Sequence, residues 1–161
     1  MTSSMFTVRR AQPRDAAALG SLGAALMGTH VAFDAQRFLA PGDHADRGYA
    51  AFLSSHLDDD DAVVFVAEVD ERIVGYVYAG LEPLSWKELR GPAGFIHDVM
   101  IDERARGTGA GTALIDAAIA WLRDRGAPRV ILWTAEHNTL AQRLFERLGF
   151  RRTMIEMTRE L

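Results

Sequence analysis

Hydrophobic and polar positions follow two periods along this chain, one typical of strands and one typical of helices. Short runs rich in β-branched and aromatic residues predict strands at residues 6–10, 63–69, 73–80, 95–101, 130–134 and 153–158. Apolar residues at helical spacing predict helices at residues 14–26, 46–56 and 113–125, and a last helix that follows Asn138. Two long loops remain between these elements, at residues 28–45 and 81–94.

The order of these elements predicts an α/β fold with a mixed sheet in one domain, residues 1–161. Strands 63–69 and 73–80 are joined by a short turn at Asp70-Glu71. Strands 95–101 and 130–134 are joined by a crossover helix, so we expect that pair to be parallel.

Two of the predicted helices carry a defined apolar face. In the second helix, Tyr49 and Phe52 should point inward. In the first helix, one face gathers Ala17, Leu19, Leu22, Ala25 and Leu26.

The composition restricts the partners and the chemistry. The net charge of −4 over 161 residues argues against a nucleic-acid partner, and agrees with a cationic substrate. Zero cysteines exclude a cysteinyl acyl intermediate. We find neither a signal peptide nor an apolar run of membrane-spanning length, so we expect a cytoplasmic enzyme with no membrane partner. The aspartate run at residues 58–61 is interpreted as a solvated turn, with attraction of a cationic substrate as the alternative.

A glycine-rich loop between a strand and a helix is the strongest candidate binding site. Glycines at 107, 109 and 111 let a ligand approach the backbone, and the helix that follows presents unpaired N–H groups at its positive end. This arrangement suits phosphate groups, although a turn without any ligand has the same pattern. It is not a Walker loop, because Gly111 is followed by Thr112 and Ala113 with no lysine. Thr112 also occupies the third glycine position of a dinucleotide fingerprint.

The loop Arg106-Gly107-Thr108-Gly109-Ala110-Gly111 has the form Arg-x-x-Gly-x-Gly. This resembles the acetyl-coenzyme A pyrophosphate loop of the GNAT-type N-acetyltransferases. The resemblance continues through residues at the spacing of the last helix of that family, namely Asn138, Ala141, Phe145 and Gly149-Phe150. It covers residues 5–158 and is strongest between 95 and 150.

The resemblance implies a single-domain GNAT fold with a mostly antiparallel sheet flanked by helices. The fourth and fifth strands would be parallel and splayed around acetyl-coenzyme A, which serves as co-substrate without a metal. The residues implied in binding it are Val99, Met100, Ile101, Arg106, Gly107, Thr108, Gly109, Ala110, Gly111, Thr112, Asn138 and Phe145. The Glu136-His137 pair has no second histidine at metal spacing, so no zinc site is expected.

The activity implied is direct transfer of the acetyl group to a primary amine of a small molecule or peptide. Two alternatives stay open: an acyl-coenzyme A binding or sensing module without turnover, and a nucleotide-binding regulator. The sequence does not identify the acceptor, and it leaves open whether the protein forms a homodimer.

Several residues are candidates for the catalytic roles. His97 is the first candidate for the base because the ordinary histidine pKa of about 6.5 suits a proton acceptor at neutral pH. Asp98 follows it and should point to the opposite face of the strand, in a structural role. Glu156, in the predicted last strand, is another candidate base. The backbone N–H near Val99 would stabilise the oxyanion. Phe145 stands where many family members have a tyrosine acid, and it has no proton to give.

Overall fold

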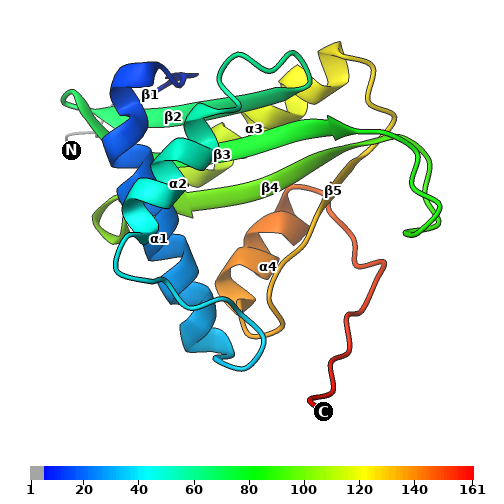
Figure 1. Cartoon of the computed structure of the whole chain (residues 1–161). Coiled ribbons are helices and arrows are strands. Elements are labelled where there is room, and N and C mark those ends of the chain that lie inside the picture. Colours follow the sequence, from blue (N-terminus) through cyan, green and yellow to red (C-terminus); the bar gives the residue numbers. More distant parts are fainter. Residues whose placement is uncertain (1–5) are drawn as a thin grey trace.

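The computed structural model describes residues 6–161, which form one five-stranded sheet with helices on both faces (Figure 1). The strands are β1 (Thr7–Arg10), β2 (Ala62–Val69), β3 (Arg72–Glu82), β4 (Ala93–Ile101) and β5 (Val130–Leu132). The α-helices are α1 (Ala16–Phe33), α2 (Ala45–Ser54), α3 (Ala110–Asp124) and α4 (Thr139–Arg147), and single 3-10 turns lie at Pro13–Asp15 and Glu103–Ala105.

The strands lie in the order β1-β2-β3-β4-β5. The first three pairings are antiparallel, and β4 pairs with β5 in parallel. The prediction that a crossover helix makes these two strands parallel is therefore confirmed. The parallel pairing is short, because it joins only three residues of each strand, from Gly94↔Val130 to Ile96↔Leu132.

Alternate residues of β2 and β3 divide the core between the two faces of the sheet. On one face, Val64 and Tyr76 pack against Leu19 of α1 and Leu53 of α2. On the other face, the strands pack against α3, whose buried contacts are Leu114, Ile115, Ala118 and Leu122. The sheet is therefore enclosed by α1 and α2 on one side and by α3 on the other (Figure 1).

Helix α1 is longer than predicted, because it continues to Phe33 and reduces the expected loop 28–45 to residues 34–44. Gly28 lowers helix stability but does not end the helix, since a single glycine costs only about 1 kcal/mol. The helix ends at Asp34, whose backbone is extended. Of its predicted apolar face, Leu19 and Leu22 are buried, whereas Ala17 and Ala25 are exposed.

The segment Pro13–Phe33 is long and apolar enough to cross a membrane by length and composition alone. The segment contains polar residues such as Asp15, Ser21 and His30, so it is not an uninterrupted apolar run, and the absence of a membrane partner remains an expectation. Core helices and signal sequences near an N-terminus pass the same test, and 22% of an apolar 18-residue window in this segment is buried, including Leu19 and Leu22 against the side chains of β2 and β3.

The predicted strand at residues 153–158 does not form. Residues 150–161 run in an extended path without sheet pairing, and Met154, Ile155 and Met157 are exposed. An alternating sequence makes a strand only where an edge is available to pair with it, and this segment pairs with none of the described strands. Glu156 instead forms an ion pair with Arg37 in the loop after α1.

Two glycines of α1 give a matched test of how closely the helices pack. A Cβ added at Gly23 would lie 2.0 Å from Cδ1 of Tyr49, whereas a Cβ at Gly28 would meet nothing within 4 Å. We expect Gly23→Ala to lower the free energy of unfolding by about 1–3 kcal/mol, because overpacking outweighs the gain in helix propensity. Gly28→Ala should raise it by up to about 1 kcal/mol. Denaturant titration of both variants measures the difference, and equal effects would contradict the packing of Tyr49 on α1.

Candidate active site

An extra residue in β4 organises the centre of the site. The pairing of β3 with β4 runs Val77↔Val99, Tyr78↔Asp98 and then Ala79↔Ile96, so His97 has no partner and forms a β-bulge. At a bulge the strict alternation of side chains fails. His97 and Asp98 consequently line the same cavity, and the expectation that they point to opposite faces was wrong.

The bulge also changes the direction of the backbone N–H groups of β4. Before it, the N–H of Gly94 donates to Arg129 O on the β5 side, at 2.9 Å; after it, the N–H of Asp102 donates to Val74 O of β3, at 2.7 Å. Gly94 and Asp102 are eight residues apart, and in a regular strand their N–H groups would point the same way. The single bulge residue reverses the direction, so the N–H groups of Val99 and Ile101 face the β5 side.

No strand occupies that side beyond the bulge among the described residues. β5 ends at Leu132, whose partner is Ile96, while β4 continues to Ile101. The two strands therefore separate and leave a slot along residues 97–101 of β4. This is the splay that the resemblance to the GNAT-type enzymes implied.

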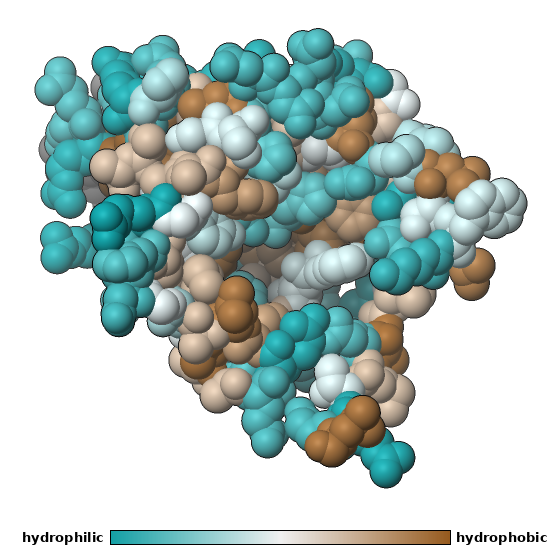
Figure 2. Space-filling view, viewed as in Figure 1, coloured by the Kyte–Doolittle hydropathy of each residue, from teal (hydrophilic) through white to brown (hydrophobic). Residues whose placement is uncertain are grey.

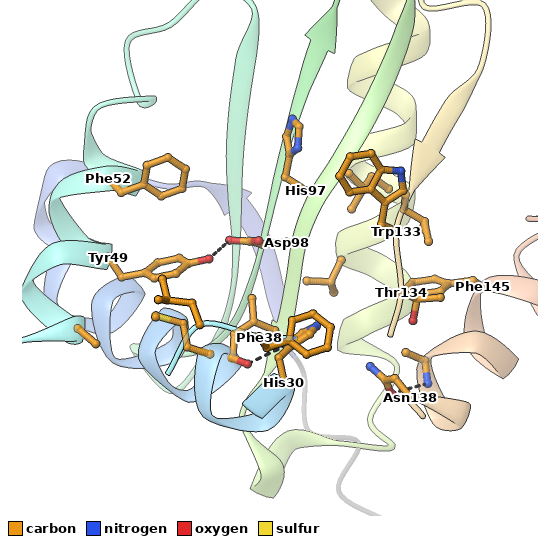
Figure 3. Close-up of a pocket in the computed structure, with 18 of the residues that line it drawn as sticks. His30, Phe38, Tyr49, Phe52, His97, Asp98, Trp133, Thr134, Asn138 and Phe145 are labelled. Carbon is orange, nitrogen blue, oxygen red and sulfur yellow. Dashed lines mark hydrogen bonds between the residues drawn. The ribbon is translucent and has the colours of Figure 1, made fainter. Parts of the chain in front are cut away.

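A cavity of about 540 Å³ lies over this slot, in the usual size range of small-molecule sites. Figure 2 shows it as a hollow in the middle of the face, bordered by both apolar and polar side chains. Its lining comes from α1, the following loop, α2, β4, β5 and α4. Figure 3 shows two groups across β4, with Tyr49 and Phe52 on one side and Trp133, Asn138 and Phe145 on the other.

Asp98 is held by two tyrosines. The hydroxyls of Tyr49 and Tyr76 donate to its Oδ2 at 2.5 Å and 3.0 Å (Figure 3 shows the first of these bonds). Burial, followed by the charge of Asp98, raises the pKa of both tyrosines. Both hydroxyls consequently keep their protons and serve as donors, which fixes the orientation of the carboxylate.

His97 stands between two cavities with its side chain 30% exposed. Its Nε2 lies 3.2 Å from Oε1 of Glu82, and its ring is tilted against that of Tyr78 with centroids 4.9 Å apart. Burial lowers the pKa of His97 below its usual value, and the nearby carboxylates of Glu82 and Asp98 oppose this shift. The imidazole is therefore neutral at neutral pH and able to accept a proton.

The glycine loop lies at the N-terminus of α3, as predicted. Gly107 and Gly109 have φ of 77° and 90°, a left-handed conformation that favours glycine. The first helical bond of α3 runs from Ala113 N to Gly109 O, and the Thr108 hydroxyl accepts from Ala110 N at 3.4 Å. The amides of the first turn consequently point out of the helix end, where an anion would meet them.

The other predicted residues have distinct positions. Asn138 caps α4 by accepting from Ala141 N at 3.3 Å, and both Asn138 and Phe145 line the cavity. The side chain of Met100 is buried beneath α1 and α2, so only its backbone is near the slot. Glu156 is not among the residues that line the cavity, so the structure does not bring it to His97 and Asp98. Glu156 is therefore not kept as a candidate base.

Several lining residues were not expected from the sequence. They include Met27, His30, Phe38, Trp133 and Thr134. Only contacts between distant segments bring these residues together. The sequence did show that Tyr76 and Tyr78 occupy alternate positions of one strand and therefore point to the same face of the sheet. Tyr49 points inward as predicted, whereas Phe52 lies at the mouth and is 46% exposed. Within residues 6–161 we find no group of three or more His, Asp or Glu side chains placed to hold a metal.

Comparison with known proteins places this chain among the acetyltransferases. The model of the Acetyltransferase (GNAT) family matches residues 30–150. Mycothiol acetyltransferase of Thermobispora bispora is 39% identical over 98 residues, which cover 61% of this chain but 33% of that protein. The chain thus spans about a third of the length of that relative. The uncharacterised N-acetyltransferase YhfO of Bacillus subtilis is 28% identical over 147 residues, covering 90% of this chain and 89% of that protein.

Among solved structures, the aminoglycoside N-acetyltransferase AAC(6')-Iy in complex with a bisubstrate analogue, CoA-S-monomethyl-acetylneamine, superposes with a TM-score of 0.76. The two share 19% identity, with 98% of this chain and 99% of that chain covered. At this identity the likeness concerns the fold. The predicted fold, a mixed sheet with parallel fourth and fifth strands, is confirmed.

The Asp98 cluster can be tested with a double-mutant cycle. Because a hydrogen bond to a charged group contributes about 1.5–3 kcal/mol, Tyr49→Phe and Asp98→Ala should show a coupling energy in this range. The control cycle pairs Asp98→Ala with Thr29→Val, because the Thr29 hydroxyl of α1 donates to Ala25 O at 3.0 Å instead. Its coupling should be near zero. Free energies of unfolding measure both cycles, and equal couplings would contradict the geometry.

Proposed function

The chain belongs to the GNAT acetyltransferase family, and on that basis we propose that it transfers the acetyl group of acetyl-coenzyme A directly to a primary amine. The observation that carries the proposal is the slot beside β4, which leads to a cavity holding a neutral imidazole and a fixed carboxylate. We do not assign the acceptor of the mycothiol acetyltransferases to this chain, because the chain spans only about a third of the length of that relative.

The residues present fit acetyl-coenzyme A. Its pyrophosphate would accept hydrogen bonds from the amides of residues 107–112, beside the positive end of α3. Its pantetheine arm would pair with the N–H groups of Val99 and Ile101, which face the slot. Asn138 and Phe145 line the other wall of the cavity, where they would contact the arm.

The reaction forms a new N–C bond and breaks the C–S bond of the thioester. The amine attacks the carbonyl carbon, and the N–H of Val99 would donate to the oxyanion of the tetrahedral intermediate. One donor of this kind stabilises the transition state by about 3 kcal/mol. The amine loses one proton during attack, and the departing thiolate gains one.

His97 is the proposed proton acceptor. If the Nε2–H donates to Glu82, the lone pair lies on Nδ1, which can then take the proton from the amine. Glu82 would act as a positioning residue that selects this tautomer, in the way that a carboxylate orients a catalytic histidine.

Phe145 cannot protonate the thiolate. Water or the protonated His97 can supply that proton, and a thiol pKa near that of cysteine, about 8.5, makes the step tolerable without a dedicated acid. The absence of an acid at position 145 is also the observation that favours the second candidate, a non-catalytic acyl-coenzyme A binding module. Release of free thiol from acetyl-coenzyme A in the presence of amines, with no release in their absence, separates the two.

The binding loop can be tested with two glycines that flank α3 and both have positive φ. Gly109 and Gly126 both have positive φ, at opposite ends of the helix, and asparagine tolerates this conformation. Gly109→Asn should weaken binding of coenzyme A about 10-fold or more, because its side chain obstructs the approach of the phosphates. Gly126→Asn should leave binding unchanged. Calorimetric titration measures both, with thermal unfolding as the check on folding. Unchanged affinity in Gly109→Asn would reject the loop as the pyrophosphate site.

The base can be tested through the pH dependence of kcat. Because the neutral imidazole is the active form and burial lowers its pKa, the rate should rise with pH along a limb centred below 6.5. His97→Ala should remove this limb and lower kcat about 100-fold. Glu82→Gln should move the limb to lower pH, since the carboxylate raises the pKa of His97. Glu156→Gln is the matched control and should change nothing. A limb that survives in His97→Ala would refute the assignment.

A further inference from the structure

We propose that the acceptor is an amine with one positive charge on an apolar, aromatic-sized body, and that Asp98 binds its ammonium group. His97 then takes one proton from this group and releases it to solvent, so that the neutral amine attacks the thioester. This proposal rests on the proposed function, and concerns the part of the cavity that lies between β4 and helices α1 and α2. An arylalkylamine such as 2-phenylethylamine has the chemistry described.

The charges of the cavity support a singly charged acceptor. Among the described residues that line it, Asp98 is the only carboxylate, and none is a lysine or an arginine. One carboxylate compensates one ammonium group, which would otherwise lose its hydration at a high cost. A second or third ammonium group would have no counter-charge in the cavity.

The geometry of Asp98 leaves it ready for a ligand. Both tyrosine hydroxyls donate to Oδ2, so Oδ1 is the oxygen to which no hydrogen bond is found within residues 6–161. The carboxylate is fixed before the ligand arrives, because Tyr76 is fully buried and Tyr49 packs on Gly23. A fixed acceptor loses little conformational entropy when it binds an ammonium group.

The walls of this part of the cavity suit an apolar body. They carry the side chains of Leu26, Met27, Phe38, Leu39, Tyr49 and Phe52. Aromatic faces also attract a cation, which favours an ammonium group near Tyr49. His30 lines the same wall, and its Nδ1 lies 2.9 Å from the carbonyl oxygen of Leu26.

The same features exclude two common kinds of amine acceptor. An α-amino acid would bring a carboxylate close to Asp98, with no lining cation to bind it. A polyamine or an aminoglycoside would bring several ammonium groups into an apolar chamber. Phenylalanine and 2-phenylethylamine differ only by the carboxylate, so they form a matched pair of substrates.

The experiment compares initial rates of thiol release from acetyl-coenzyme A with 2-phenylethylamine, phenylalanine, ethylamine and spermidine. We expect 2-phenylethylamine to have the highest kcat/KM. Asp98→Asn should raise its KM about 10- to 100-fold, since a charged partner is lost, while the KM for acetyl-coenzyme A stays the same. Asparagine can still accept from both tyrosines, so this variant should fold.

A second variant tests the apolar wall. Phe38→Ala should reduce the preference for 2-phenylethylamine over ethylamine, because only the larger amine reaches that wall. Trp86→Ala is the control: this tryptophan is exposed and lies outside the cavity, so the preference should not change.

The outcomes separate this inference from the proposed function. Efficient acetylation of spermidine or phenylalanine, with 2-phenylethylamine a poor substrate, would overturn the inference and leave the acetyltransferase intact. An unchanged KM for 2-phenylethylamine in Asp98→Asn would overturn the role of Asp98 alone. Binding of acetyl-coenzyme A without turnover of any of the four amines would overturn both proposals.

Discussion

The site depends on one extra residue in the fourth strand. Because β4 accommodates His97 as a bulge against β3, two consecutive side chains enter the same cavity, and the N–H groups after the bulge turn away from β3. Without the bulge, Val99 and Ile101 would use their N–H groups to pair within the sheet. The bulge therefore produces both the side chains and the backbone donors that the proposed chemistry needs. β-Bulges re-aim residues in this way next to many active sites.

Close packing of two helices supports the same centre from one side. Gly23 of α1 leaves room for the ring of Tyr49, whose hydroxyl reaches Asp98 across the cavity wall. Tyr76 completes the cluster from β3 and is fully buried. A carboxylate in such surroundings is stable only with its hydrogen bonds satisfied, so the packing of α1, α2 and the sheet is coupled to the orientation of the group that we propose as ammonium site.

Most of the fold could be predicted from the sequence, because its elements follow from local periodicity. The parallel pairing of β4 and β5 followed from the crossover helix, and the glycine loop was located from its residues alone. The register of β3 against β4 could not be predicted, since a bulge depends on how two strands pair and not on either strand alone. For that reason Asp98 was expected on the wrong face. The strand expected around Glu156 failed for a related reason, because local alternation does not provide an edge to pair with.

Amide hydrogen exchange of β4, with and without coenzyme A, tests the central claim most directly. The amides of Met100 and Asp102 should be protected in both states, because they point to β3; Asp102 donates to Val74 O. Those of Val99 and Ile101 should exchange rapidly in the free protein and become protected when coenzyme A binds. Protection of Val99 and Ile101 in the free protein, or no change on binding, would contradict the bulge as the origin of the site.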